Sequence, residues 1–527
     1  MRVRVLWIPI LLVAACFGER ETYHGLLNKQ VASDQLPAAK YLQERVVDGK
    51  LRLSLHEAIV ATLMGNSAIR LQQLNVEDVK FSLLHAHSPF DPTVLGSFGA
   101  TREEVPTSSD LQGAPIFSQL TQSAQLTYKQ AFETGTNVEI GLNASRFSSN
   151  SIFNTFNPSF SSGLGFRITQ PLLRNRWLFA NRVSLIIARR NLSSSRSTFE
   201  AQVNDAILNV VTQYWNVVQA RGNLEIAKKS QDAAEASYKR DKRALELGAL
   251  PPLDIFRSES QLAARRVQVI QSEYQLKQVE DVLRFTLGAM TDSLLRALDL
   301  DLTEMPAPAA DLSGIDSASA LAEAMEHRPE LEAQRKLLAN DEDNVKLAHN
   351  NLLPDLRLTG TYSGNGVAGG AGRGLGDTLH QAFTFGFPTY GVSLNLNLPL
   401  RNRAAQADLG TALVARHRDL FAERQLQELI TKECSDAVHQ LQQASLSLAA
   451  SREALELAKK NLAAEQRKHE LGSETVFFVL EAQTEVAQAE SNVLQAEAAY
   501  QVAVAAVEHA TGKISDAYHV LITDMMR

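Results

Sequence analysis

The segment Glu246-Leu247-Gly248-Ala249 has a counterpart late in the chain, Glu470-Leu471-Gly472-Ser473. The same offset places Leu287-Gly288 on Thr511-Gly512 and superposes one series of apolar residues on another. Repetition at a fixed offset is the sequence sign of a duplicated structural unit. The chain therefore consists of two tandem repeats. The superposed apolar series is Ile255, Leu262, Val269, Leu276 and Leu283 on Val479, Val486, Val493, Tyr500 and Val507.

The two repeats, a linker and two flanking segments make up the expected organisation of the chain. The repeats span about 51–288 and 319–513, and residues 289–318 form a linker with a Pro/Ala/Asp-rich run from Met305 to Ser319. Such composition between periodic segments is typical of a connection. Residues 1–15 and 16–50 precede the first repeat, and residues 514–527 form a tail.

Each repeat holds one very long helix and a shorter one that follows it. Residues 178–247 and 403–471 consist almost entirely of helix-forming residues, and residues 252–287 and 476–511 continue the pattern. A continuous helix of about 70 residues would be roughly 100 Å long, which requires a coiled coil. Apolar residues in 476–511 alternate at spacings of four and three, as in a left-handed coiled coil. They are Ala482, Val486, Ala489, Val493, Ala496, Tyr500, Ala503, Val507 and Ala510.

The segments between the helices read as strands, in about 93–172 and 355–400. Residues 389–400 alternate apolar side chains with Gly, Ser and Asn. This is the pattern of a strand between lipid and a water-filled lumen, although a soluble β-sandwich shows it too. The long helices and an export signal favour the membrane. The clearest strands are Ser123–Phe132, Thr136–Phe147, Phe160–Leu172, Asp355–Ser363 and Thr389–Leu400.

Composition excludes several classes of protein. The net charge of −7 provides no basic stripe for nucleic acid, and two cysteines are too few for a disulfide scaffold or a cysteine-rich metal site. After the N-terminus no apolar run reaches the length of a spanning helix, and the mean hydropathy is −0.14. Any membrane passage must therefore be built from strands.

The first residues have the form of an export signal. Arg2 and Arg4 precede the apolar run Val5–Ala15, and the run ends at Cys16 after small residues. This ending is similar to the lipobox of bacterial lipoproteins, in which the cysteine carries the lipid. An ordinary cleavable signal followed by a chance cysteine is the alternative.

No motif supports catalysis, a cofactor or a metal site. The chain has no nucleophile elbow, no HExxH and no phosphate-binding loop. His85 and His87 have the spacing of ligands, but two histidines are too few, and we interpret them as a surface pair at a helix end. Gly364–Gly369 matches G-x-G-x-x-G. We expect no helix after it, and therefore an exposed loop (364–376) rather than a dinucleotide site.

In this layout the chain resembles the TolC-like outer-membrane efflux proteins, in their lipidated form. The resemblance implies an α+β membrane protein that forms a homotrimer. Three chains share one transmembrane β-barrel, and their long helices form a periplasmic α-barrel. The family pattern is four strands per chain, whereas an extra hairpin near 119–147 is apparent here, either within the barrel or outside it. The motifs are Leu55-His56-Glu57-Ala58 with its counterpart Leu321–Ala324, Arg328-Pro329-Glu330-Leu331, Leu352–Leu356, Gln170–Leu173, Asn397–Leu400, Tyr214-Trp215 and the two Leu-Gly turns.

The resemblance also implies roles for the two turns. Leu247, Gly248, Leu471 and Gly472 would form the periplasmic tip that an adaptor protein contacts, although plain helix-hairpin turns explain the same residues. Acidic residues that follow the second turn narrow the closed pore in the family. The matching positions here are Phe478 and Glu481, with Asp254 in the first repeat. Three interpretations of these positions remain. Glu481 carboxylates form a ring, or Phe478 forms an apolar constriction, or the residues belong to a solvated helix face.

The function implied is a passive exit duct, lipid-anchored in the outer membrane and completed by an adaptor and an inner-membrane pump of a tripartite efflux or type I secretion system. The alternative is a non-conducting coiled-coil lipoprotein of the envelope, which would have no use for lipid-facing strands. A stand-alone porin is disfavoured because porins lack such helices. The sequence does not name the exported substrate.

Overall fold

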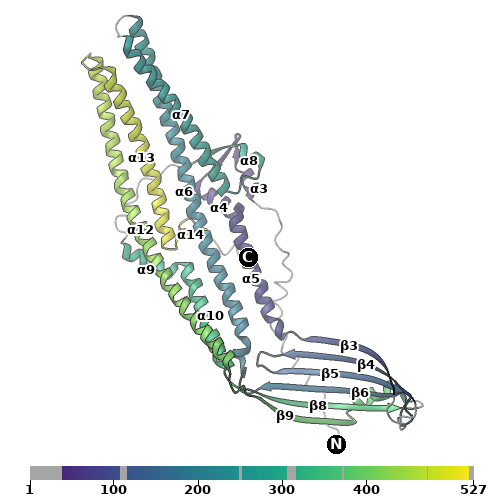
Figure 1. Ribbon diagram of the computed structural model, residues 1–527. Coiled ribbons are helices and arrows are strands. Elements are labelled where there is room, and N and C mark those ends of the chain that lie inside the picture. The colour runs from purple at the N-terminus through teal and green to yellow at the C-terminus, as the bar shows by residue number, and fades with distance from the viewer. Residues whose placement is uncertain are drawn as a thin grey trace. The chain divides into compact units, whose positions relative to one another are not determined.

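The computed structural model describes residues 38–106, 115–247, 252–304, 316–370, 373–471 and 473–520 (Figure 1). Cys16, Gly248 and Gly472 lie outside the described residues, and so does the side chain of Asp254. The chain divides into two compact units. Among the described residues, the helical unit comprises 38–78, Ser193–Arg335 and 422–520, and the sheet unit comprises Val79–Leu192 and Lys336–Phe421.

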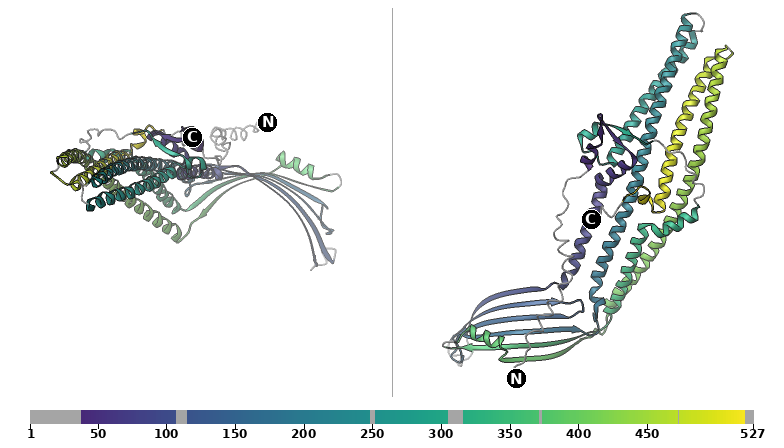
Figure 2. Two further views of the ribbon diagram at one scale, coloured as in Figure 1. Left: turned by 90° about the horizontal axis from the view of Figure 1, so that it is seen from above. Right: turned by 180° about the vertical axis from the view of Figure 1, so that it is seen from behind.

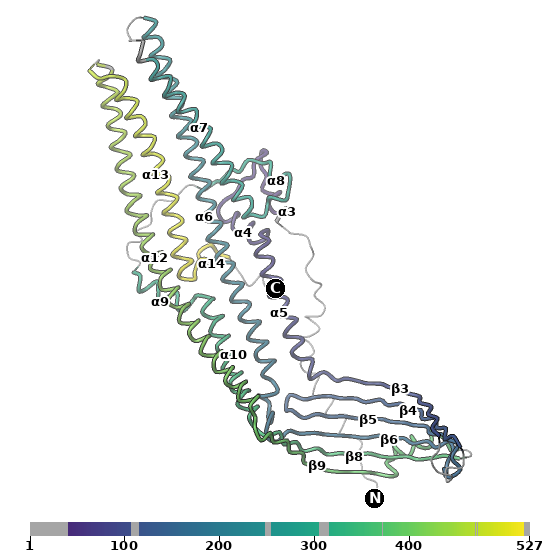
Figure 3. Tube along the Cα trace, in the orientation of Figure 1, coloured from purple at the N-terminus to yellow at the C-terminus, as the bar shows by residue number. Residues whose placement is uncertain are grey.

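The described residues form four long helices in the positions that the composition predicts. They are α6 (Leu178–Glu246), α7 (Pro252–Thr286), α12 (Arg403–Glu470) and α13 (Val476–Ala510). Figure 3 shows α6 beside α7 and α12 beside α13, each pair antiparallel. Most of the apolar series on α13 is buried, including Ala482, Val493 and Tyr500. The alternating spacing thus marks the side of α13 that packs.

Each repeat opens with two short helices separated by a corner. In the first repeat they are α4 (Leu55–Gly65) and α5 (Ser67–His87), and in the second α9 (Ser317–His327) and α10 (Pro329–Asn351). Ser54 caps α4: its hydroxyl accepts from the amide of Glu57, and the Glu57 carboxylate accepts from the amide of Ser54 (2.9 Å). This capping box explains the glutamate of the Leu55–Ala58 motif.

A small sheet joins segments that the sequence analysis kept apart. After α3 (Ala38–Gln43), the strands β1 (Val46–Val47) and β2 (Lys50–Leu53) form a hairpin, and β2 pairs in parallel with β7 (Asp299–Leu302). The short helix α8 (Ser293–Ala297) precedes β7, and α14 (Ile514–Ala517) follows α13. The first part of the expected linker 289–318 is therefore folded, because Leu300 and Leu302 are buried.

The sheet unit holds one six-stranded antiparallel sheet in the order β3-β4-β5-β6-β8-β9. Figure 2 shows that this sheet is curved. The hairpin near 119–147 belongs to it as β4 and β5, joined by the turn at Gly135 (φ +83°). The strands are β3 (Thr93–Pro106), β4 (Ile116–Ala131), β5 (Asn137–Ser149), β6 (Ser159–Pro171), β8 (Asp355–Gly369) and β9 (Phe387–Asn397).

The Gly364–Gly369 segment is not an exposed loop, and the expectation that no helix follows it was wrong. These residues continue β8, and helix α11 (Leu375–Phe383) begins soon afterwards and packs on β8 and β6. A Cβ at Gly366 would overlap the carbonyl oxygen of Thr378. The glycines therefore let the helix approach the strand closely. A dinucleotide fingerprint would need them in a turn that opens a helix.

Candidate functional site

The two faces of the large sheet have opposite chemistry. The strand register places Leu164, Tyr362 and Tyr390 on one face, and Gly165, Ser363 and Thr389 on the other. On β4 and β5 the register continues the apolar face through Leu126 and Leu142 and the polar face through Gln125 and Asn143, while Gln122 and Arg146 lie on the apolar face farther along the strands. On the polar face Lys129 and Glu139 form an ion pair (3.9 Å), and Arg167 lies opposite Glu139 in the register. One face of this sheet suits lipid and the other suits water.

The two edges of the sheet have strand partners on one side only. Within the described residues, β3 pairs only with β4, and β9 only with β8. Every residue of both edge strands is exposed. Long edge strands with unpaired amide and carbonyl groups are templates for pairing with another chain.

The expected tip residues lie at the ends of the long helices. Leu247 follows α6 and is 84% exposed, and Leu471 follows α12 and is 70% exposed. Their amides donate to the carbonyls of Arg243 and Arg467 (3.1 Å each), one turn earlier. The backbone of the helix is thus satisfied while both leucine side chains are left for an outside contact.

The expected constriction residues lie near the start of α13. The rings of Phe477 and Phe478 meet edge to face with centroids 5.4 Å apart. The guanidinium of Arg257 on α7 lies 5.9 Å from the centroid of Phe477, a cation–π distance. Glu481 is exposed, and its carboxylate has no hydrogen bond or ion pair with any described residue. The structure therefore joins Phe478 to a contact between α7 and α13 and leaves Glu481 out of it.

Two further contacts continue this seam between α7 and α13. Gln261 donates to the hydroxyl of Thr484 (3.4 Å), and Arg265 donates to the same hydroxyl. Arg257, Gln261 and Arg265 follow one another at helical spacing, so one side of α7 faces α13. Burial lowers the pKa of Arg265. Sequence analysis missed these contacts because nothing local connects residues so far apart in the chain.

Beyond the seam lies a polar groove of roughly 630 Å³ between α6, α7 and α13. Its walls are mainly glutamine, asparagine and serine, such as Gln268, Gln488 and Asn223, and Ser491 donates to Asn223 (2.9 Å). A lining of this kind holds water, so the two helical pairs of the chain do not form a continuous dry core here.

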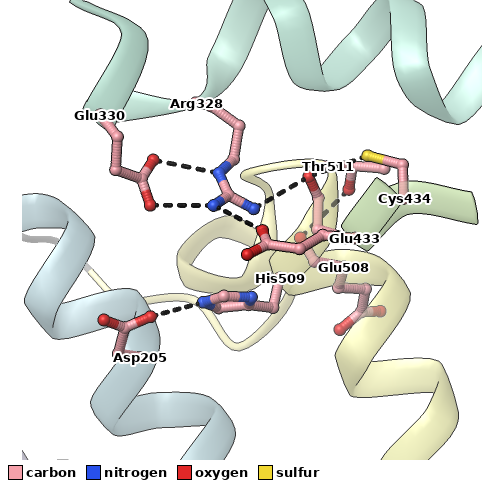
Figure 4. Close-up of polar contacts among 9 residues, drawn as sticks. Asp205, Arg328, Glu330, Glu433, Cys434, Glu508, His509 and Thr511 are labelled. Carbon is pink, nitrogen blue, oxygen red and sulfur yellow. Dashed lines mark hydrogen bonds and ion pairs between the residues drawn. The ribbon is translucent and has the colours of Figure 1, made fainter. Parts of the chain in front are cut away.

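The Arg328-Pro329-Glu330-Leu331 motif forms the corner between α9 and α10 (Figure 4). Arg328 donates two hydrogen bonds to Glu330 (3.0 Å each), one to Glu433 on α12 (3.0 Å) and one to the carbonyl of Ala510 at the end of α13 (3.4 Å). Its side chain is only 6% exposed. Attraction by both glutamates raises the pKa of Arg328 in spite of the opposing effect of burial, which is the largest single influence. The motif therefore ties a corner to two long helices.

The other polar contacts in Figure 4 serve the same junction. The thiol of Cys434 lies 3.5 Å from the carbonyl of Ala510, and His509 contacts Asp205 on α6 (2.8 Å). Burial raises the pKa of the Cys434 thiol and of the Glu508 carboxyl. The Cys434 contact joins α12 to α13, and the His509 contact joins α13 to α6.

The first repeat contains an equivalent corner. Asn66 follows α4 and donates to the carbonyl of Thr286 at the end of α7 (3.1 Å). Gly288 has φ +74°, and a Cβ there would overlap the carbonyl of Gly65. In the second repeat Gly512 (φ +79°) lies against His327 in the same way. The Leu287-Gly288 and Thr511-Gly512 pairs, found first as a sequence repeat, thus end equivalent helices against equivalent corners.

In the described part of the chain, no group of three or more His, Cys, Asp or Glu side chains is arranged to hold a metal ion. His85 and His87 lie in the last turn of α5. Over the same residues, no helix has both the length and the apolarity to cross a bilayer.

Comparison with known proteins agrees with this architecture. The family model "Outer membrane efflux protein" matches residues 135–289 and 320–513. The chain is 25% identical over 362 residues to outer membrane protein TolC of Vibrio cholerae serotype O1, covering 68% of this chain and 77% of that protein. It is 22% identical over 353 residues to outer membrane efflux protein BepC of Brucella suis biovar 1, covering 67% and 72%.

Solved structures show the same fold. The Campylobacter jejuni CmeC outer membrane channel superposes with a TM-score of 0.64 at 15% identity, covering 92% of this chain and 93% of that one. The strands β3 and β4 lie before the first segment matched by the family model.

Proposed function

The chain belongs to the outer membrane efflux protein family, and on that premise we propose that three copies form one passive duct through the outer membrane and the periplasm. Efflux across the outer membrane is the function of the family. Three copies, an adaptor protein and an inner-membrane pump are the further elements of the proposal.

The observation that supports closure by further copies is the sheet with one apolar face and, among the described residues, two edges without a second strand partner; the number three is taken from the family. In hydrocarbon each unsatisfied backbone group costs several kcal/mol, so an open sheet does not persist there. The edge strands β3 and β9 run in opposite directions, since every neighbouring pair in the sheet is antiparallel. The β9 edge of one copy can therefore pair antiparallel with the β3 edge of the next.

Native mass spectrometry of the detergent-extracted protein tests this step. A complex of three copies is expected. A single copy that salt removes from membranes would contradict it and would favour the alternative, a non-conducting coiled-coil lipoprotein of the envelope. The anchor proposed for either form is a lipid on Cys16, which the mass of the mature N-terminal peptide would reveal.

The exposed leucines at the ends of α6 and α12 are proposed as the adaptor contact, together with Gly248 and Gly472. Leu247→Glu or Leu471→Glu should reduce the yield of a periplasmic adaptor co-purified from cross-linked envelopes, because a carboxylate would have to be desolvated on contact. Leu294→Glu is the matched control, since that leucine is 68% exposed but lies on α8. Equal losses in all three variants would remove the tip from the proposal.

Glu481, Phe478 and Asp254 are proposed to narrow the pore at the start of α7 and α13. Three Glu481 carboxylates around the axis would attract cations and repel anions. Glu481→Ala should therefore raise resting conductance in a planar bilayer and weaken block by multivalent cations. Phe478→Ala should raise conductance without changing that block. If neither property responds to Glu481→Ala, this glutamate belongs to a solvated helix face.

A further inference from the structure

We infer that the outer-membrane barrel of this protein has eighteen strands, six from each copy, rather than the twelve that four strands per chain would give. The inference rests on the proposed trimer and concerns the number of strands that close it. Its basis is the β4–β5 hairpin, which lies inside the sheet and not beside it.

The hairpin is fully integrated with its neighbours. In a four-stranded sheet β3 and β6 would be adjacent, but here the hairpin lies between them. Strand β4 pairs with β3 from Pro106↔Ile116 to Thr93↔Lys129. Strand β5 pairs with β6 from Phe147↔Ser159 to Asn137↔Thr169. Each of the six strands has 11 to 16 residues. A transmembrane strand needs about 9–11. The hairpin is therefore long enough to cross the bilayer with the others.

The chemistry of the hairpin is that of a lipid-facing pair of strands. On its apolar face Tyr128 lies opposite Ile140, Leu126 opposite Leu142, and Ala124 opposite Ala144. The next pair outward is Gln122 and Arg146, whose side chains are hydrogen-bonded (2.9 Å). Such a band, apolar over several residues and then polar, is typical of strands at membrane depth. A hairpin surrounded by water would not need an apolar band aligned with that of β6.

The opposite face of the hairpin continues the polar face of the sheet. Gln125 and Asn143 are opposite each other, and Lys129 is paired with Glu139. At the turn of the hairpin, Glu133 pairs with Arg182 in the first turns of α6. The hairpin turn is thus fixed at the end of the sheet where α6 begins, as expected for strands that share the barrel.

Six strands per copy change the width of the duct. With strands about 4.8 Å apart and tilted by about 40°, eighteen strands close at a radius of about 18 Å, against about 12 Å for twelve. Allowing roughly 5 Å for side chains on the wall leaves a lumen about 26 Å across instead of about 14 Å. Small residues on the polar face keep it wide: Gly99, Ser123, Gly141, Ser145, Ser161, Gly163, Gly165, Ser363, Gly391 and Ser393.

The outer-membrane section would therefore have roughly three times the cross-section of a twelve-stranded one. Hydrated polymers, such as polypeptide or polysaccharide segments, fit a lumen of this width. Selection by size would then occur only in the periplasmic part of the duct.

Spin labels in the full-length protein, reconstituted in lipid vesicles, test the placement of the hairpin. Nitroxides replace Leu126 and Gln125 on β4, and Leu394 and Asn395 on β9 serve as matched references. The nitroxide at position 126 should be relaxed mainly by lipid-soluble oxygen, as the nitroxide at position 394 is expected to be. The label at 125 should behave as that at 395, relaxed by a water-soluble nickel chelate. Relaxation of both β4 labels by nickel would place the hairpin outside the barrel and overturn the inference.

Electron cryo-microscopy of the same vesicles or of nanodiscs counts the strands along the threefold axis. Eighteen strands around a lumen about 26 Å wide are expected. A threefold complex with twelve strands would overturn this inference and leave the proposed function standing. A single copy without threefold symmetry would overturn the proposed trimer, and the eighteen-stranded barrel with it.

Discussion

Gly288→Ala probes the corner that both repeats share. Gly288 has a positive φ, and an alanine Cβ would overlap the backbone carbonyl of Gly65, which cannot move aside as a side chain could. The left-handed conformation costs an alanine about 1–2 kcal/mol, and steric overlap adds about 1–3 kcal/mol. Gly288→Ala should therefore lower the local stability by about 3 kcal/mol.

Two other glycines calibrate this value. Gly49 has nearly the same φ (+75°) and no atom within 4 Å of an added Cβ, so Gly49→Ala should cost only about 1 kcal/mol. At Gly512 the nearest atom, the carbonyl oxygen of His327, would be 3.0 Å away, which predicts an intermediate cost of about 2 kcal/mol.

Hydrogen exchange of the detergent-solubilised protein, read by mass spectrometry, measures these costs locally. The amides of Leu287, Gly288 and Ala289 are bonded to the end of α7. Their exchange should become about 100-fold faster in Gly288→Ala, because each 1.4 kcal/mol is a factor of ten. The turn at Gly49 should change by less than about tenfold in Gly49→Ala. Equal effects in the two variants would refute the steric reasoning and leave only backbone strain.

Arg328, Tyr214 and Cys434 of the helical unit can each be tested separately. Arg328→Gln should lower the free energy of unfolding in urea by about 3 kcal/mol, because Glu330 and Glu433 lose the buried guanidinium that pairs with both. Arg335→Gln is the control and should change it by less than about 1 kcal/mol, since the side chain of Arg335 is 53% exposed where it pairs with Glu423 (3.8 Å). Similar changes in the two variants would contradict this reasoning. Burial raises the pKa of Tyr214 from 10.0 to about 12, so the folded state favours the neutral phenol. The stabilisation of the folded state by this phenol is therefore complete below pH 10 and is lost as the pH rises to about 12. Tyr214→Phe should abolish that alkaline loss, and an unchanged pH profile would show that other groups cause it. Cys434, 1% exposed, should resist maleimide in the native protein and react on unfolding, and rapid native labelling would contradict its burial.

The long helices and the strand alternation could be predicted because their signals are local and extended. Composition over about 70 residues places α6 and α12, and period-two alternation places β9. Shorter or longer-range features left no such signal. The four residues of β7 are too few for a period to be recognised, and β2 lies far away in the sequence. The end of β8 was assigned to a loop because it is rich in glycine. These glycines instead allow α11 to pack closely on the strand.

The candidate site could likewise be predicted only where its signal is local in the sequence. The alternation that assigns two faces to the sheet is written along each strand, and the repeat identifies both turns. The contact of Arg257 with Phe477 and the bonds from Arg328 to Glu433 connect residues that only the tertiary fold brings together. The Arg328 motif was recognised as a pattern, but its role as a brace between a corner and two helices required the structure.

The proposed duct requires that copies of this chain complete a water-filled passage through the membrane. Conductance of the purified protein in a planar lipid bilayer measures whether they do. Discrete, uniform current steps that appear with the detergent-extracted complex are the predicted result. A protein that inserts into the bilayer and carries no current, in the wild type and in Glu481→Ala alike, would contradict it.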